Sequence, residues 1–288
     1  MAIMEIFRRF PFFMNPFFKK IATILMPKGL KEKSKVHFQN AMQKATQRME
    51  RGNNDRDDFF SHLLREKENG PKITREFILA QSNTLIVAGS ETTATFLIGV
   101  TYYLLNRPET LRRLQEEIRN AFTSSQDITS DSTAALPYLS AVIEEGLRIY
   151  PPVPMGLPRE CPGATIDGHY VPKGAIVCVS GYVATHNEEY FADANEFHPE
   201  RYLPPSHPFY DSRYQNDDKD ASKPFSLGSR ACLGVNLAYM EMRLVLARLA
   251  WEFDWELKSK ELNWERDSKL VVFWKKPELR VGFTPVKR

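Results

Sequence analysis

The chain has 288 residues, 42% of them hydrophobic and 26% charged, which is ample for a sizeable globular core. A net charge of +3 without a Lys/Arg block argues against a nucleic-acid-binding protein. The three cysteines, Cys161, Cys178 and Cys232, are odd in number and widely spaced. This pattern is a poor disulfide framework and favours a reducing compartment, with at least one cysteine kept for chemistry.

The N-terminal part of the chain is predicted to be helical. Its first twenty residues do not form a secretory signal, because charged residues and prolines interrupt the apolar stretches. Residues 17–67 mix charged and apolar positions at helical spacing, with polar breaks at 51–55 and 68–72.

The longest apolar stretch, residues 77–105, predicts a long helix that begins near Thr74, a capping residue. A hydropathy scan would allow this stretch to span a membrane. However, it carries several polar residues and Glu91, and a glutamate facing lipid is costly. We therefore predict a core helix that lines a cavity.

Downstream of residue 107 the pattern changes from helices alone to mixed helices and strands. The predicted elements are a helix over 108–122, a loop over 123–135, a helix over 137–150, a hairpin over 164–171, a strand over 175–179, a polar loop over 203–224, a helix over 233–253 and a second hairpin region over 269–283. The helix over 233–253 is apolar nearly all round, which predicts that it is buried. This order indicates an α+β fold, mainly α, with a helical core and small β-sheets.

The most informative segment is residues 225–234, Phe-Ser-Leu-Gly-Ser-Arg-Ala-Cys-Leu-Gly. Cys232 comes at the start of a predicted helix, where unpaired N–H groups and the helix dipole favour a thiolate over a thiol. The thiolate is the form that binds iron. Gly228 permits a tight turn, and Gly234 lets the backbone approach a flat macrocycle closely.

Two further side chains of this segment suit a haem. Arg230 offers a forked donor to a carboxylate such as a haem propionate, and Phe225 supplies an apolar wall beside the sulfur. The alternative is a buried structural cysteine with glycines serving only as turns. However, the residues fall at the spacing FxxGxRxCxG, and a chance match in this length is on the order of one in ten thousand or rarer.

The segment resembles the cysteine-ligand loop of cytochromes P-450, and three further motifs match that family in its order. The first is Ala-Gly-Ser-Glu-Thr-Thr over residues 88–93, which is similar to the oxygen-activation motif (A/G)Gx(D/E)T. The resemblance implies that Glu91 and Thr92 deliver protons to the oxygen that the haem activates. The alternative is a helix whose polar residues are satisfied by backbone bonding.

The other two motifs imply a structural cluster. Residues 145–148 are similar to ExxR, whose ends share one helix face, and Pro-Glu-Arg-Tyr over 199–202 is similar to the PERF segment. By resemblance Glu145, Arg148 and Arg201 form a cluster that holds the haem loop. Glu144 could pair with Arg148 at i+4 instead, and the sequence leaves that choice open.

The resemblance covers nearly the whole chain but not the whole family fold. It implies a single domain over 1–288 that corresponds to the C-terminal portion of a cytochrome P-450. Its parts would be cap helices over 1–70, the oxygen-activation helix over 74–105 and the haem-binding region over 137–288. Family members normally have a long N-terminal portion before this point, including a membrane anchor in eukaryotes.

The resemblance also implies an activity. One atom of O₂ would enter a small apolar organic substrate on iron protoporphyrin IX, with Cys232 as the axial ligand and with Arg230 and Arg159 at the propionates. A solvated loop arginine is the alternative interpretation of Arg159. An external NADPH-dependent flavoprotein reductase is implied, because no GxGxxG follows a predicted strand.

Location and pathway are further expectations from the resemblance. Residues 155–162 and the Asp-Gly hairpin resemble microsomal-type members of fungal secondary-metabolite pathways, which work at the cytosolic face of the endoplasmic reticulum. Without an anchor in view, this chain is expected to be cytoplasmic or peripheral. The Phe-rich start would touch a membrane or serve as an ordinary packing surface.

Three other functions compete with an active monooxygenase. A truncated, inactive fragment without stable haem binding is the first, because the N-terminal portion of the family fold is missing from this sequence. Haem-thiolate isomerase or dehydratase chemistry is the second, and the Glu91-Thr92 pair argues against it. A helical scaffold without enzyme activity is the third, and it would make four motifs coincidental.

Overall fold

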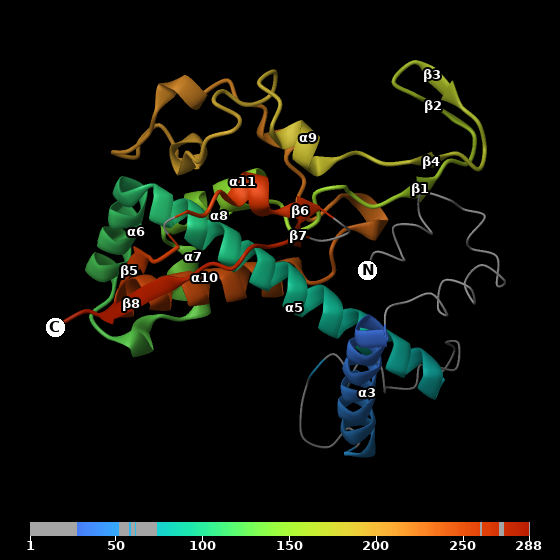
Figure 1. The fold of residues 1–288 in the computed structure, drawn as a ribbon. Helices are drawn as coiled ribbons and strands as arrows, with labels where there is room; N and C mark the ends of the chain where they lie inside the picture. Colours follow the sequence, from blue (N-terminus) through green and yellow to red (C-terminus); the bar gives the residue numbers. More distant parts are fainter. Residues whose placement is uncertain are drawn as a thin grey trace. The chain divides into compact units, whose positions relative to one another are not determined.

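Figure 1 shows the computed structural model of the chain, which describes residues 28–51, 58, 61, 74–259, 261–270 and 274–287. The chain divides into two compact units, Met1–Glu91 and Thr92–Arg288. The single domain predicted over 1–288 stays a prediction, because this division does not say whether each unit folds independently. The Phe-rich start lies outside the described residues.

The first unit contains helix α3 (Lys28–Glu50) and the N-terminal part of helix α5 (Arg75–Asn106). Thr74 caps α5 as predicted, because its Oγ1 accepts a hydrogen bond from the N–H of Phe77 at 3.2 Å. Arg48, in the last turn of α3, donates to both carboxylate oxygens of Asp58 at 2.8 and 2.9 Å.

The second unit has a helical core. Besides the C-terminal part of α5, its helices are α6 (Pro108–Ala121), α7 (Ser130–Ala134), α8 (Pro137–Ile149), α9 (Gly181–Thr185), α10 (Val235–Glu252) and α11 (Trp264–Asp267). In Figure 1, α6, α7, α8 and α10 lie together, and α8 contacts the other three. Ten of the 13 residues of α8 are buried, so this helix is the centre of the core.

Small antiparallel sheets complete the second unit, which confirms the predicted α+β class. The strand pairs are β1 (Arg159–Glu160) with β4 (Ile176–Val177), β2 (Ala164–Ile166) with β3 (His169–Val171), β5 (Phe253–Leu257) with β8 (Val281–Pro285), and β6 (Lys269–Leu270) with β7 (Trp274–Lys275). The predicted Asp-Gly hairpin is confirmed: Asp167 and Gly168 have φ values of 48° and 75°, as a tight two-residue turn requires.

Two predictions about the second unit are wrong. The expected loop over 123–135 contains a 3₁₀ turn, Ser125–Asp127, and helix α7, because Ser124 and Thr129 each open a capping box. Helix α10 is not buried all round. One stripe is buried, but Leu237 and Val245 on other positions are 40% and 37% exposed, because α10 packs through one face.

Helix α5 is the one helix in the described part of the chain that is long and apolar enough to span a membrane, with a mean hydropathy of 1.3. Core helices of soluble proteins have the same length and composition. The C-terminal part of α5 lies in the core of the second unit, where Phe96, Val100 and Leu104 are buried. This part of α5 is a core helix, as predicted. That the whole stretch over 77–105 is a core helix lining a cavity stays a prediction.

Glycines let α5 and α8 approach closely. A Cβ at Gly146 would lie 2.8 Å from Cε2 of Phe96 and 3.1 Å from Cγ2 of Val100. A Cβ at Gly99 would lie 2.4 Å from Cδ1 of Tyr150. Because Phe96, Val100 and Tyr150 are all buried in the core, these glycines set the distance between the two helices.

We expect Gly146→Ala to lower the free energy of unfolding by about 1–3 kcal/mol, since overpacking outweighs the better helix propensity of alanine. Urea denaturation followed by circular dichroism would measure it. Gly89→Ala is the matched control, because a Cβ there meets nothing within 4 Å and α5 would gain up to about 1 kcal/mol. Equal effects at both glycines would contradict the packing argument.

Candidate functional site

The cysteine loop closes on itself just before α10. The Cys232 N–H donates to the carbonyl of Phe225 at 2.8 Å, and the Ala231 N–H donates to the carbonyl of Gly228 at 3.0 Å. Ser226 and Gly228 have φ values of 61° and 71°, in the left-handed region. Gly228 therefore supplies a conformation that most other residues would adopt only with strain.

Cys232 is exposed, and its place relative to α10 differs from the prediction. The helix begins at Val235 with Gly234 as its N-cap, so Cys232 lies two residues before the cap. Its N–H is committed to Phe225 and is not one of the unpaired donors of the helix. The helix thus begins two residues later than the predicted start at 233. The prediction that its N-terminus favours the Cys232 thiolate stays a prediction.

The surroundings of Cys232 fit a flat apolar cofactor. Leu227 and Leu233 flank it along the loop and are 66% and 80% exposed. A Cβ at Gly234 would lie 4.0 Å from the Cys232 Sγ, so glycine leaves this side of the sulfur open. In this arrangement Cys232 would hold the iron of a haem, and Leu227 and Leu233 would supply apolar contacts to it.

Phe225 joins the loop to the core. Its half-buried ring lies 5.1 Å from the ring of Tyr239 on α10, at an angle of 43°. The Tyr239 hydroxyl donates to Oε1 of Glu144 on α8 at 2.7 Å. Glu144 is therefore engaged with Tyr239, which answers the choice that the sequence left open.

The partner of Arg148 is Glu145. The Arg148 Nε and Nη2 donate to the two carboxylate oxygens of Glu145 at 2.7 and 2.8 Å, and both side chains are fully buried. The remaining Arg148 N–H groups reach carbonyls at 2.6–2.7 Å. These carbonyls belong to Thr185, Ala194 and Glu196. All five donors of the guanidinium thus have acceptors.

Arg201 completes the cluster from the 3₁₀ turn Pro199–Tyr202. Its Nε lies 3.0 Å from Oε2 of Glu145, which is an ion pair without the alignment of a hydrogen bond. The N–H of His198 donates to the other Glu145 oxygen at 2.7 Å. The structure therefore brings together the three residues that the motifs pair, Glu145, Arg148 and Arg201.

Glu145 offsets the cost of burying the charge of Arg148. Burial alone would lower the pKa of Arg148, but the charge of Glu145 and its hydrogen bonds raise that pKa above its usual value. Asp217 supplies a second carboxylate, which contacts Nη1 of Arg201. Sequence analysis missed Asp217, because it lies in the polar segment over 203–224 and carries no motif.

The other predicted site residues lie apart from this cluster. Arg230 is exposed at the end of the 3₁₀ turn Gly228–Arg230, and Arg159 is exposed on β1, where it donates to the Pro158 carbonyl at 3.0 Å. Glu91 and Thr92 are half-buried on α5. Glu91 is the last residue of the first unit, and Thr92 is the first residue of the second. Their predicted roles stay predictions.

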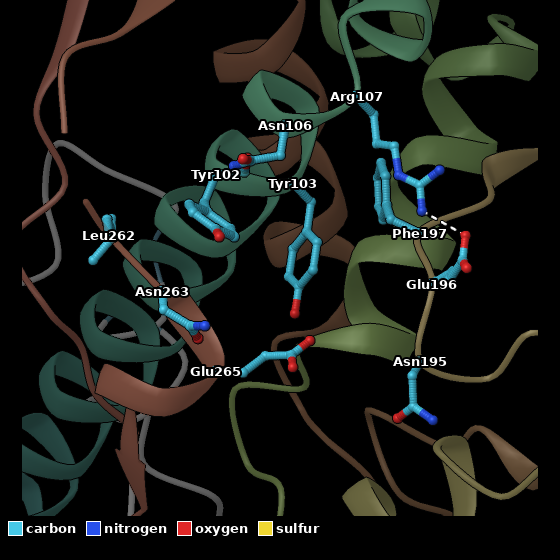
Figure 2. Close-up of a pocket in the computed structure, with 10 residues that line it drawn as sticks. All are labelled: Tyr102, Tyr103, Asn106, Arg107, Asn195, Glu196, Phe197, Leu262, Asn263 and Glu265. Atoms are coloured by element: carbon cyan, nitrogen blue, oxygen red, sulfur yellow. Dashed lines mark hydrogen bonds and ion pairs between the residues drawn. The ribbon is translucent and has the colours of Figure 1, made fainter. Parts of the chain in front are cut away.

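A cavity of about 320 Å³ lies elsewhere, at the C-terminal end of α5 (Figure 2). Its lining is Tyr102, Tyr103, Asn106, Arg107, Asn195, Glu196, Phe197, Leu262, Asn263 and Glu265. Figure 2 shows the Arg107–Glu196 ion pair, at 2.6 Å, and the Tyr103 hydroxyl directed toward Glu265. Burial, and to a lesser extent the charge of Glu265, raise the pKa of Tyr103. Because no predicted site residue lines this cavity, we do not place the chemistry there.

The cysteine loop, the Glu–Arg–Arg cluster and the order of the motifs agree with a comparison across protein families. The family model described as Cytochrome P-450 matches residues 2–283. The chain belongs to the cytochrome P-450 family.

Three proteins similar to this P-450 chain come from fungi. The cytochrome P-450 monooxygenase btcC of Colletotrichum orbiculare is 48% identical over 88% of the chain. The monooxygenases poxC of Penicillium oxalicum and BOA3 of Botryotinia fuckeliana are 48% and 49% identical over 90% and 88% of it. The matched regions cover 49%, 54% and 50% of these relatives, so the chain spans about half their length.

Proposed function

We propose that Cys232 is the axial thiolate ligand of a haem, iron protoporphyrin IX, in a monooxygenase. The single observation that carries this proposal is the exposed sulfur in a closed loop whose flanking leucines face solvent. Cys161, at 2% exposure, is instead buried in the way of a packing cysteine. Cys178 is exposed, but it does not belong to such a loop.

The other residues have supporting roles. The bound haem would supply the activation of O₂. Phe225 shields the thiolate from water, and the guanidinium groups of Arg230 and Arg159 neutralise the propionates. Glu91 and Thr92 would relay protons, the Glu91 carboxylate accepting a proton from solvent and the Thr92 hydroxyl passing one on toward the oxygen site.

The partners follow from the same chemistry. The substrate is a small apolar organic molecule, and electrons come from an NADPH-dependent flavoprotein reductase. Similarity to fungal monooxygenases supports a role in secondary-metabolite biosynthesis, on the cytosolic face of the endoplasmic reticulum for a full-length protein.

Haem reconstitution of the purified chain tests this proposal. We expect one haem per chain, and a ferrous–CO complex with the red-shifted Soret band that marks thiolate ligation. A folded chain that retains no haem after gel filtration would instead support the inactive-fragment alternative. Bound haem without the red-shifted band would contradict Cys232 ligation.

A further inference from the structure

A hydrogen bond ties α8 to α10 immediately behind the cysteine loop. The Tyr239 hydroxyl donates to Oε1 of Glu144 at 2.7 Å, across 95 positions in the sequence. Tyr239 and Glu144 are both half-buried, so this bond is screened less than one on an open surface. Neither residue belongs to the motifs that indicate the family.

The same tyrosine also contacts a guanidinium group. The guanidinium of Arg243, one turn along α10, lies 5.3 Å from the centre of the Tyr239 ring. Burial raises the pKa of Glu144, while the Tyr239 hydrogen bond and the charge of Arg243 act against this rise. The charge of Arg243 therefore stabilises the half-buried carboxylate of Glu144. Tyr239 contacts both groups, Arg243 through its ring and Glu144 through its hydroxyl.

Tyr239 leads directly to the backbone of Cys232. Its ring packs on Phe225 at 5.1 Å, and the Phe225 carbonyl accepts the Cys232 N–H at 2.8 Å. Tyr239 is thus linked to Cys232 through two contacts, the ring contact with Phe225 and the hydrogen bond from Cys232 to Phe225. Phe225 itself is only half-buried, so the core does not enclose it on every side.

We propose that Tyr239 is a positioning residue, anchored by Glu144, that holds Phe225 and thereby the backbone at Cys232 in the conformation required for thiolate ligation. This inference rests on the proposed function of Cys232. According to this inference, Glu144 on α8 and Tyr239 on α10 determine how rigidly the loop holds the sulfur of Cys232.

Amide hydrogen exchange on the full chain tests the positioning step without haem. In Tyr239→Phe, which keeps the ring and loses the hydroxyl, we expect the Cys232 amide to exchange at least threefold faster than in the unmodified chain. The Cys161 amide is the matched reference, because it also donates to a carbonyl, that of Ala175, at 2.8 Å. Its exchange rate is expected to stay the same.

Variants of Glu144 separate anchoring from general packing. Glu144→Gln keeps an oxygen that accepts the Tyr239 hydroxyl and should leave the Cys232 exchange rate near its original value, whereas Glu144→Leu should reproduce Tyr239→Phe. The double variant Glu144→Leu/Tyr239→Phe should be no faster than the faster single variant, because both remove one interaction. Tyr170 on β3 is 73% exposed. The variant Tyr170→Phe is the control for loss of a hydroxyl group and should leave the Cys232 exchange rate unchanged.

The reconstituted protein provides a spectroscopic measurement. After the ferrous–CO complex forms, its thiolate-type band decays with time. We expect this decay to be at least three times faster in Tyr239→Phe and Glu144→Leu than in the unmodified protein and in Glu144→Gln. If neither variant changes Cys232 exchange, or if Cys161 exchange rises equally, the inference is overturned. If the unmodified protein has no thiolate-type band, the proposed function fails, and the exchange experiment still decides whether Tyr239 positions the loop.

Discussion

Cys232→Ala is expected to abolish the red-shifted Soret band of the ferrous–CO complex completely. Alanine has no atom that can bind iron, and the loop over residues 225–234 contains no other cysteine or methionine. Haem content should also fall, because the iron–sulfur bond is lost and only the apolar contacts and the proposed propionate contacts of Arg230 and Arg159 would remain. The measurement is the CO difference spectrum of the reconstituted variant at matched protein concentration.

The chain contains a control for this substitution. Cys178 is also a free, exposed cysteine, but it follows strand β4 and lies outside the FxxGxRxCxG segment. We expect Cys178→Ala to keep both the band and the haem content. A thiolate-type band that survives in Cys232→Ala and disappears in Cys178→Ala would move the ligand to Cys178.

Arg148→Met is expected to have the largest effect on stability, a loss of about 3–5 kcal/mol in the free energy of unfolding. Methionine removes all five donors and leaves Glu145 buried with Arg201 as its remaining charged partner in the motif cluster. The carbonyls of Thr185, Ala194 and Glu196 lose their donor as well. Urea denaturation followed by circular dichroism would measure the change.

An exposed arginine provides the comparison. Arg112 on α6 makes ion pairs with Glu109 and Glu116, and all three side chains are about half exposed. Because exposed pairs contribute little, Arg112→Met should leave the urea midpoint unchanged within error. Adding Glu145→Gln to Arg148→Met should restore part of the lost stability, since it removes the uncompensated charge. An equal loss in the two arginine variants would show that burial of the cluster does not matter.

Several elements could be predicted from sequence because their signals are local. Thr74, Pro108 and Pro137 mark the starts of α5, α6 and α8 through capping and proline preferences that act within one turn. The Asp167-Gly168 turn likewise depends on two adjacent residues. The capping boxes at Ser124 and Thr129 were equally local, and attention to them would have predicted α7.

The pairing of strands β5 and β8 was not predictable in the same way. Strand β5, Phe253–Leu257, begins where the predicted helix over 233–253 ends, and β8, Val281–Pro285, begins inside the predicted hairpin region over 269–283. Their register, with Trp255 opposite Phe283, depends on a contact across 28 positions that no local pattern encodes. The exposed face of α10 was not predictable for the same reason. The spacing of apolar residues does not show which faces of an apolar helix pack against other elements.

The sequence by itself determined the family and the candidate ligand, because the spacing FxxGxRxCxG and the order of four motifs are properties of the chain alone. Only the tertiary structure decided that Glu145 and not Glu144 binds Arg148, and that Glu144 binds Tyr239. Glu144 and Glu145 are adjacent acids on one helix and point to different sides of it. Their partners therefore depend on which helix or loop packs against each side, which the sequence of α8 does not contain.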